Sequence, residues 1–187
     1  MTITSISSLL IMLFSAETPK AAHCVEYGEY SNIAPPAKGS IEGEISGIEI
    51  ELWKCDDKIL GLFSEYCGLP ADPPTGKLDA IKYDSISGNL SFKVKISLGS
   101  MPGSRNNEMI DSRDIYSFSG KVKRHKYIKG KLELISDRLD RIVANTKTIT
   151  LKYDENQEQN KNKNTSILKL DLEKRISEIL DFRGPKW

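Results

Sequence analysis

The sequence contains few residues that commonly serve as metal ligands or nucleophiles. Among 187 residues there are three cysteines and two histidines, and no Cys-x-x-Cys spacing that would indicate zinc. Gly-x-Ser-x-Gly, His-Glu-x-x-His and phosphate-binding-loop motifs are also missing. The net charge is only +1, from 27 basic and 26 acidic residues, which gives no overall reason to expect nucleic acid as a partner. We therefore expect no cofactor and no metal, and we favour a non-catalytic protein.

Apolar runs of transmembrane length are missing as well. The unbroken run from Leu9 to Phe14 is too short to span a bilayer but fits the hydrophobic region of a signal peptide. No Lys or Arg precedes this run, and cleavage after Ala22 would place Lys20 where a small residue is preferred. The alternative is a buried N-terminal strand or helix. We predict that residues 1–22 are a signal peptide or hydrophobic leader and that the protein is exported, to the periplasm or outside the cell.

An exported chain with three cysteines should form one disulfide and retain one thiol. Cys55 lies at a predicted hairpin turn, and Cys67 follows about nine residues down the returning strand, roughly 30 Å away. A disulfide needs Cα atoms within about 7 Å. The spacing therefore predicts a Cys24–Cys67 bond with Cys55 free.

Alternating apolar and polar residues predict a mainly β fold. The clearest strand covers residues 90–98, where Leu90, Phe92 and Val94 begin a series that alternates with serines and lysines. Similar alternation predicts strands at residues 48–53, 58–66, 77–84, 116–122, 128–134 and 149–153. Residues 23–40 are expected to form an irregular lead-in, and residues 99–114 a long loop that either covers a barrel mouth or is disordered.

These segments predict an antiparallel meander of seven or eight strands within residues 23–153, as a small barrel or a sandwich. Closing the barrel would remove its exposed edges. In outline, residues 41–153 resemble the calycin-type barrels, such as avidins and lipocalins. The resemblance implies an interior that is filled or that holds one small ligand. The lipocalin Gly-x-Trp signature would need glycine before Trp53 at position 51, where the sequence has Glu51.

Two stretches of the sequence share a spacing of glycine and tyrosine. Tyr83 follows Gly76 by seven residues, and Tyr127 follows Gly120 by the same number. In both stretches a second glycine, Gly88 or Gly130, is followed by alternating polar and apolar residues. The spacing predicts two equivalent β-hairpins, with chance similarity between strands as the alternative.

The C-terminal part differs in composition from the predicted barrel. Residues 154–164 contain no apolar side chain, so we interpret residues 154–165 as a polar linker. Residues 166–187 then form a predicted amphipathic helix and tail that ends before Gly184. Its apolar positions are Ile167, Leu168, Leu172, Ile176, Ile179 and Leu180. The helix either packs on the barrel or binds a partner protein while the polar linker tethers it to the barrel.

The hairpin at residues 121–131 is the strongest candidate for a binding surface. It contains six cations and no anion: Lys121, Lys123, Arg124, Lys126, Lys129 and Lys131. Residues 41–57 are instead mainly acidic. The cluster also has an explanation without a binding function, because lysines at a sheet edge discourage pairing between molecules. The functional hypothesis is that Lys123, Arg124, Lys126 and Tyr127 capture an acidic protein or an anionic envelope polymer.

Trp53 lies on the polar face of its predicted strand, together with Glu49 and Glu51. An exposed tryptophan can bind sugars or a protein, and otherwise packs under a loop or covers a barrel end. Paired carboxylates would suit a small envelope hydrolase, although alternating glutamates are ordinary on an exposed strand face. We expect a non-catalytic exported β-barrel that binds a small ligand or a protein. The alternatives are such a hydrolase, or an inhibitor or immunity-type protein that acts through its charged hairpin.

Overall fold

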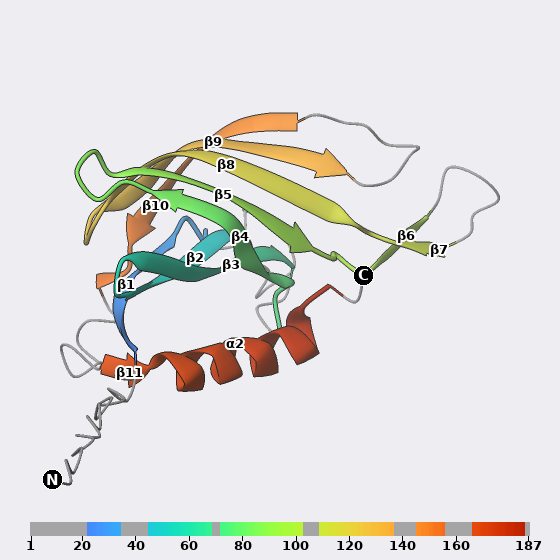
Figure 1. Cartoon of the computed structure of the whole chain (residues 1–187). Helices are drawn as coiled ribbons and strands as arrows, with labels where there is room; N and C mark the ends of the chain where they lie inside the picture. The colour runs from blue at the N-terminus through green and yellow to red at the C-terminus, as the bar shows by residue number, and fades with distance from the viewer. Residues whose placement is uncertain are drawn as a thin grey trace, which may run out of the picture.

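The chain forms an eight-stranded antiparallel barrel with one added strand and a C-terminal helix (Figure 1). The computed structural model describes residues 22–34, 45–68, 72–102, 109–136, 145–155 and 166–185. The predicted leader, except Ala22, and most of the predicted linker lie outside these ranges. The barrel strands are β1 (His23–Ser31), β2 (Ile45–Cys55), β3 (Lys58–Gly68), β4 (Thr75–Tyr83), β5 (Asn89–Ile96), β8 (Asp114–Lys123), β9 (Tyr127–Ser136) and β10 (Asn145–Tyr153).

Neighbouring strands pair in the order of the predicted meander, and the barrel closes where β10 meets β1. Tyr30 is opposite Tyr153 at this closure, and Ser31 is opposite Lys152. The predicted barrel is therefore confirmed, and closure satisfies strand edges that a sandwich would leave open. Both stretches with the repeated spacing form hairpins, β4–β5 and β8–β9. Their matched residues are not equivalent, because Tyr83 ends β4 whereas Tyr127 begins β9.

The middle of the barrel is a packed core. In β5 the alternation is as predicted, because Phe92 and Val94 are buried while Lys93 is exposed. The Phe92 ring stacks on Phe118 of β8, with the ring centroids 5.0 Å apart. Phe63 stacks in the same way on Tyr116, at 5.3 Å. These described side chains pack against one another within the barrel and are closed to water.

The prediction of an irregular lead-in is wrong for residues 23–31, which form β1. The register of β1 against β2 shifts between Glu26 and Gly28, so β1 contains a β-bulge. Tyr27 and Tyr30 both join the barrel core although they are three residues apart. The bulge hides the strand from a period-two search, because apolar positions before and after it fall out of phase.

A second buried layer lies outside the barrel, beneath helix α2 (Lys169–Arg183). A short strand, β11 (Ser166–Leu168), pairs with the start of β1 and leads directly into this helix. Leu172 and Ile176 of α2 are buried in a cluster that also contains Trp53 and Leu62. The helix therefore packs on the barrel, which decides between the two alternatives left open by its sequence.

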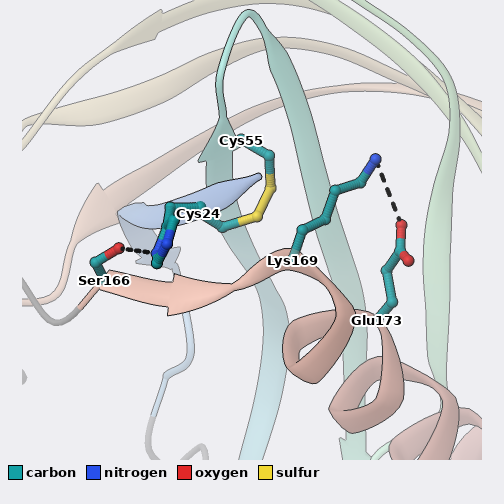
Figure 2. The surroundings of a disulfide bond; sticks show 6 residues. Cys24, Cys55, Ser166, Lys169 and Glu173 are labelled. Atoms are coloured by element: carbon teal, nitrogen blue, oxygen red, sulfur yellow. Dashed lines mark hydrogen bonds and ion pairs between the residues drawn. A yellow bond between two sulfur atoms is a disulfide. The ribbon is translucent and has the colours of Figure 1, made fainter. Parts of the chain in front are cut away.

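The disulfide joins Cys24 to Cys55, so the predicted Cys24–Cys67 pairing is wrong (Figure 2). Cys24 and Cys55 are directly opposite in the β1–β2 ladder, with their Cα atoms 4.0 Å apart. Cys67 is a free, exposed thiol. The error follows from the missed strand, because an irregular lead-in offers no register that would place Cys24 beside Cys55. The bond closes β1 onto β2 next to the start of α2.

The predicted long loop at residues 99–114 contains a small hairpin of its own. Its strands are β6 (Ser100–Pro102) and β7 (Met109–Asp111), and the tip between them lies outside the described residues. The hairpin projects from the barrel wall between β5 and β8 (Figure 1). Among the residues that the structure describes, no helix has the length and apolar character needed to cross a membrane.

Candidate functional site

Two hairpin turns meet at one end of the barrel. One joins β4 to β5 at residues 84–88, and the other joins β8 to β9 at residues 124–126. The amide of Val122 donates a 2.8 Å hydrogen bond to the carbonyl of Gly88, which ties the hairpins together. Gly88 has a φ of 70°, a left-handed conformation that glycine adopts without strain. The contact fixes the relative position of two turns that come from different parts of the sequence.

The first turn is rigidified by the side chain of Asp84. Its carboxylate accepts hydrogen bonds from the amide of Ile86, at 2.9 Å, and from the hydroxyl of Ser87, at 2.6 Å. These two hydrogen bonds hold the pKa of Asp84 below its ordinary value. Ile86, at the top of the turn, is 97% exposed.

A recess of about 360 Å³ lies between the two turns. Its lining includes three cations and three tyrosines: Lys121, Lys123, Arg124, Tyr27, Tyr83 and Tyr127. Three of the four predicted binding residues of the basic hairpin, Lys123, Arg124 and Tyr127, thus come together here. The fourth, Lys126, is exposed in the same turn but does not line the recess.

The tyrosines of this recess form an ordered aromatic floor. The hydroxyls of Tyr27 and Tyr83 are hydrogen-bonded at 2.5 Å, and their rings meet edge to face. The Arg124 guanidinium lies 5.2 Å from the centre of the Tyr27 ring, within cation–π range. Burial and then the Tyr27 hydrogen bond raise the pKa of Tyr83 to about 12, so this hydroxyl stays protonated at neutral pH. The recess can therefore offer positive charge and hydroxyl groups to an anion.

Behind this floor lies a second layer of rings that supports the turn. His125 packs edge to face on Tyr153, with the ring centroids 4.9 Å apart, and Tyr153 in turn contacts Tyr30. Burial is the main reason that the pKa of Tyr30 is raised. His125 thus has a packing role beside the site.

The opposite wall of the barrel gathers carboxylates. Glu29 and Glu51 are opposite each other in the β1–β2 ladder, and Glu49 follows on the same outer face. Burial raises the pKa of Glu49 to about 7, and the nearby carboxylates of Glu29 and then Glu51 add to the effect. Glu49 also accepts a 3.4 Å hydrogen bond from Tyr66. Glu49 and Glu51 lie on the outer face as predicted, but Glu49 is half-buried and the neighbouring Glu29 is buried.

Trp53 is not available for binding, since only 5% of its surface is exposed. It is packed beneath α2, where the Arg175 guanidinium lies 5.9 Å from the centre of its ring. The sequence showed correctly that Trp53 points away from the barrel interior. The outer face at this position is covered by a helix that lies more than a hundred residues later in the chain.

Tyr27 and Tyr83 of the recess were not predicted as site residues. Tyr83 carried a signal, because it occupies the same place in the repeated hairpin pattern as Tyr127. Tyr27 carried none, because it belongs to the bulged strand β1. Among the described residues, no cluster of His, Cys, Asp or Glu is arranged to hold a metal ion. Comparisons of the chain with protein-family models, curated proteins and solved structures found no match.

Proposed function

We propose that this protein is an exported, non-catalytic binding protein that captures an anionic partner at the basic end of its barrel. The observation that carries the proposal is the recess between the two turns. There Lys121, Lys123 and Arg124 surround an aromatic floor that contains a cation–π contact. Positive charge beside hydroxyl groups and rings suits carboxylate, phosphate or sulfate groups.

The arrangement of cations in the hairpin supports this proposal. Lys121 is directly opposite Lys129 in the β8–β9 ladder, and like charges in such a pair are destabilising. Protection of sheet edges does not account for them, because β8 and β9 each pair on both sides. A bound anionic partner would offset the repulsion.

The packed core also favours binding at the end of the barrel. Described interior side chains such as Phe63, Phe118 and Leu132 are at most 1% exposed, so they pack against their neighbours and do not line an open cavity. Export is supported by the Cys24–Cys55 disulfide, since such bonds persist in oxidising compartments.

Charge reversal tests the proposal. The test variant carries Lys123→Glu, Arg124→Glu and Lys126→Glu. The control variant carries Lys77→Glu, Lys93→Glu and Lys147→Glu, which change the charge equally at exposed positions outside the recess. Binding of fluorescent alginate, polyphosphate and poly-L-glutamate is measured by anisotropy at low and physiological salt.

We expect salt-sensitive binding of at least one polymer. The test variant should weaken it at least about tenfold, and the control variant less than about threefold. If no polymer binds at low salt, or if both variants weaken binding equally, the proposal is wrong. Thermal unfolding of each variant shows whether a loss of binding reflects a loss of folding.

A further inference from the structure

A second recess lies on the outer wall of the barrel, next to the first. Its volume is about 730 Å³, and it crosses strands β4, β5, β8 and β9. Seven of its lining residues have polar side chains: Lys82, Tyr83, Asp84, Asn89, Ser91, Ser119 and Lys131. The Asp84 carboxylate is hydrogen-bonded within its own turn, to the amide of Ile86 and the hydroxyl of Ser87. We call this recess the outer groove. It adds Lys82 and Lys131 to the cations of the end recess.

The strand register explains the shape of the outer groove. Lys82 is opposite Ser91, Ser91 is opposite Ser119, and Ser119 is opposite Lys131. These four side chains form one row across four strands. With about 4.8 Å between strands, the two lysines are about 14 Å apart and the two serines lie between them. The row thus places hydroxyl groups between two cations.

Two glycines occupy inward-facing positions in the wall that carries the outer groove. Gly120 and Gly130 face each other across β8 and β9. A Cβ atom added to either would lie 2.6 Å from the Cα of the other and 2.7 Å from the Phe118 ring. Side chains at these positions would disturb the packed core, so variants that test the outer groove should leave both glycines in place.

The two recesses share one lining residue. Tyr83 lines both of them. Asn89 of the outer groove is directly opposite Lys121 of the end recess in the β5–β8 ladder. An extended ligand could therefore follow the wall from Lys131 past Tyr83 to Arg124.

We infer that the outer groove and the end recess form one extended site for a linear acidic polysaccharide. This inference rests on the proposed function and names its ligand class. Ser91, Ser119 and Asn89 offer hydrogen bonds to sugar hydroxyls, while the lysines at either side match acid groups that repeat along a chain. An extended peptide that pairs its backbone with a sheet edge finds no open edge here, because β5, β8 and β9 each pair on both sides. A neutral glycan would not use the cations.

Oligomannuronates of two to twelve sugars test this inference by isothermal titration calorimetry. A short oligomer should bind at the end recess, and the affinity should rise with length as the outer groove is filled. Lys131→Glu should weaken the longest oligomer at least about tenfold and the shortest less than about threefold. Lys147→Glu is the control, because it reverses an exposed lysine on the neighbouring strand β10 that lines neither recess.

The outcomes separate this inference from the proposed function. If Lys131→Glu and Lys147→Glu have equal effects at every length, the outer groove is not used and the inference is wrong. If poly-L-glutamate of matched charge binds as tightly and responds to Lys131→Glu in the same way, the partner is an acidic protein and the inference is again wrong. Neutral dextran should not bind. The proposed function fails separately if the triple reversal at the turn leaves the binding of all oligomers unchanged.

Discussion

Glu49 should make the stability of the protein depend on pH in a direction unusual for a carboxylate. Burial and the neighbouring Glu29 and Glu51 raise its pKa in the folded state to about 7, against 4.5 for an ordinary glutamate. Tyr66 on β3 is the other titratable group hydrogen-bonded to it. The folded protein therefore holds a proton on the Glu49–Glu29 pair that the unfolded chain releases near pH 4.5.

The sign follows from this linkage. The bound proton stabilises the folded state. This contribution is fully present below pH 4.5 and is lost as the pH rises through about 7. Each pKa unit corresponds to about 1.4 kcal/mol, and the partial exposure of Glu49 to water reduces the total effect to about 1–2 kcal/mol. Glu49→Gln cannot lose a proton. It should therefore stabilise the protein by about 1–2 kcal/mol at pH 8 and leave it nearly unchanged at pH 4.

Urea denaturation at pH 4 and pH 8, followed by circular dichroism, measures this difference. The control is Glu178→Gln, which removes an exposed ion pair with Lys174 on α2 and should change stability by less than about 0.5 kcal/mol at either pH. The difference in unfolding free energy between a variant and the wild type at the same pH removes the contributions of the other titrating groups. An equal effect of Glu49→Gln at both pH values would refute the shared proton.

Two further predictions concern the fold. Replacing Cys24 and Cys55 by serine should cost about 3–4 kcal/mol by the loop-entropy relation, while Cys67→Ser should change stability by less than about 0.5 kcal/mol. Mass mapping should show one Cys24–Cys55 bond, and a Cys24–Cys67 bond would contradict the β1–β2 register. Phe92→Ala should cost about 3–5 kcal/mol because the ring is buried against Phe118, while Lys93→Ala should cost less than about 0.5 kcal/mol. Equal losses in urea denaturation would show that the β5 register is wrong.

The alternation of side chains was sufficient to predict most of the barrel. In β5 and β9 one face is core and the other is water, so hydrophobicity reports directly which way a residue points. The pattern failed at β1, where Tyr27 and Tyr30 are both buried across a bulge. It also failed to describe the environment of Trp53, because period two identifies the outer face of a strand but does not show whether a distant helix covers it.

The candidate site was predictable only in part, for a related reason. The cations of residues 121–131 are adjacent in sequence, so their clustering could be seen before the fold was known. Tyr27 joins them through the closed β-sheet, and Tyr83 joins them through the contact between Gly88 and Val122. Contacts of this kind depend on which hairpins become neighbours around the barrel.

The two sides of the barrel differ in what covers their outer faces. On the side of β1 and β2, the disulfide and α2 bury the outer face, so a second apolar layer reinforces that wall. On the side of β5, β8 and β9, no described helix covers the outer face (Figure 1). Outward positions there carry lysines and serines, and Lys121 is directly opposite Lys129, a like-charge pair that is unfavourable. A structural scaffold has no need for such an arrangement. It is expected of a surface that remains accessible to a partner of opposite charge.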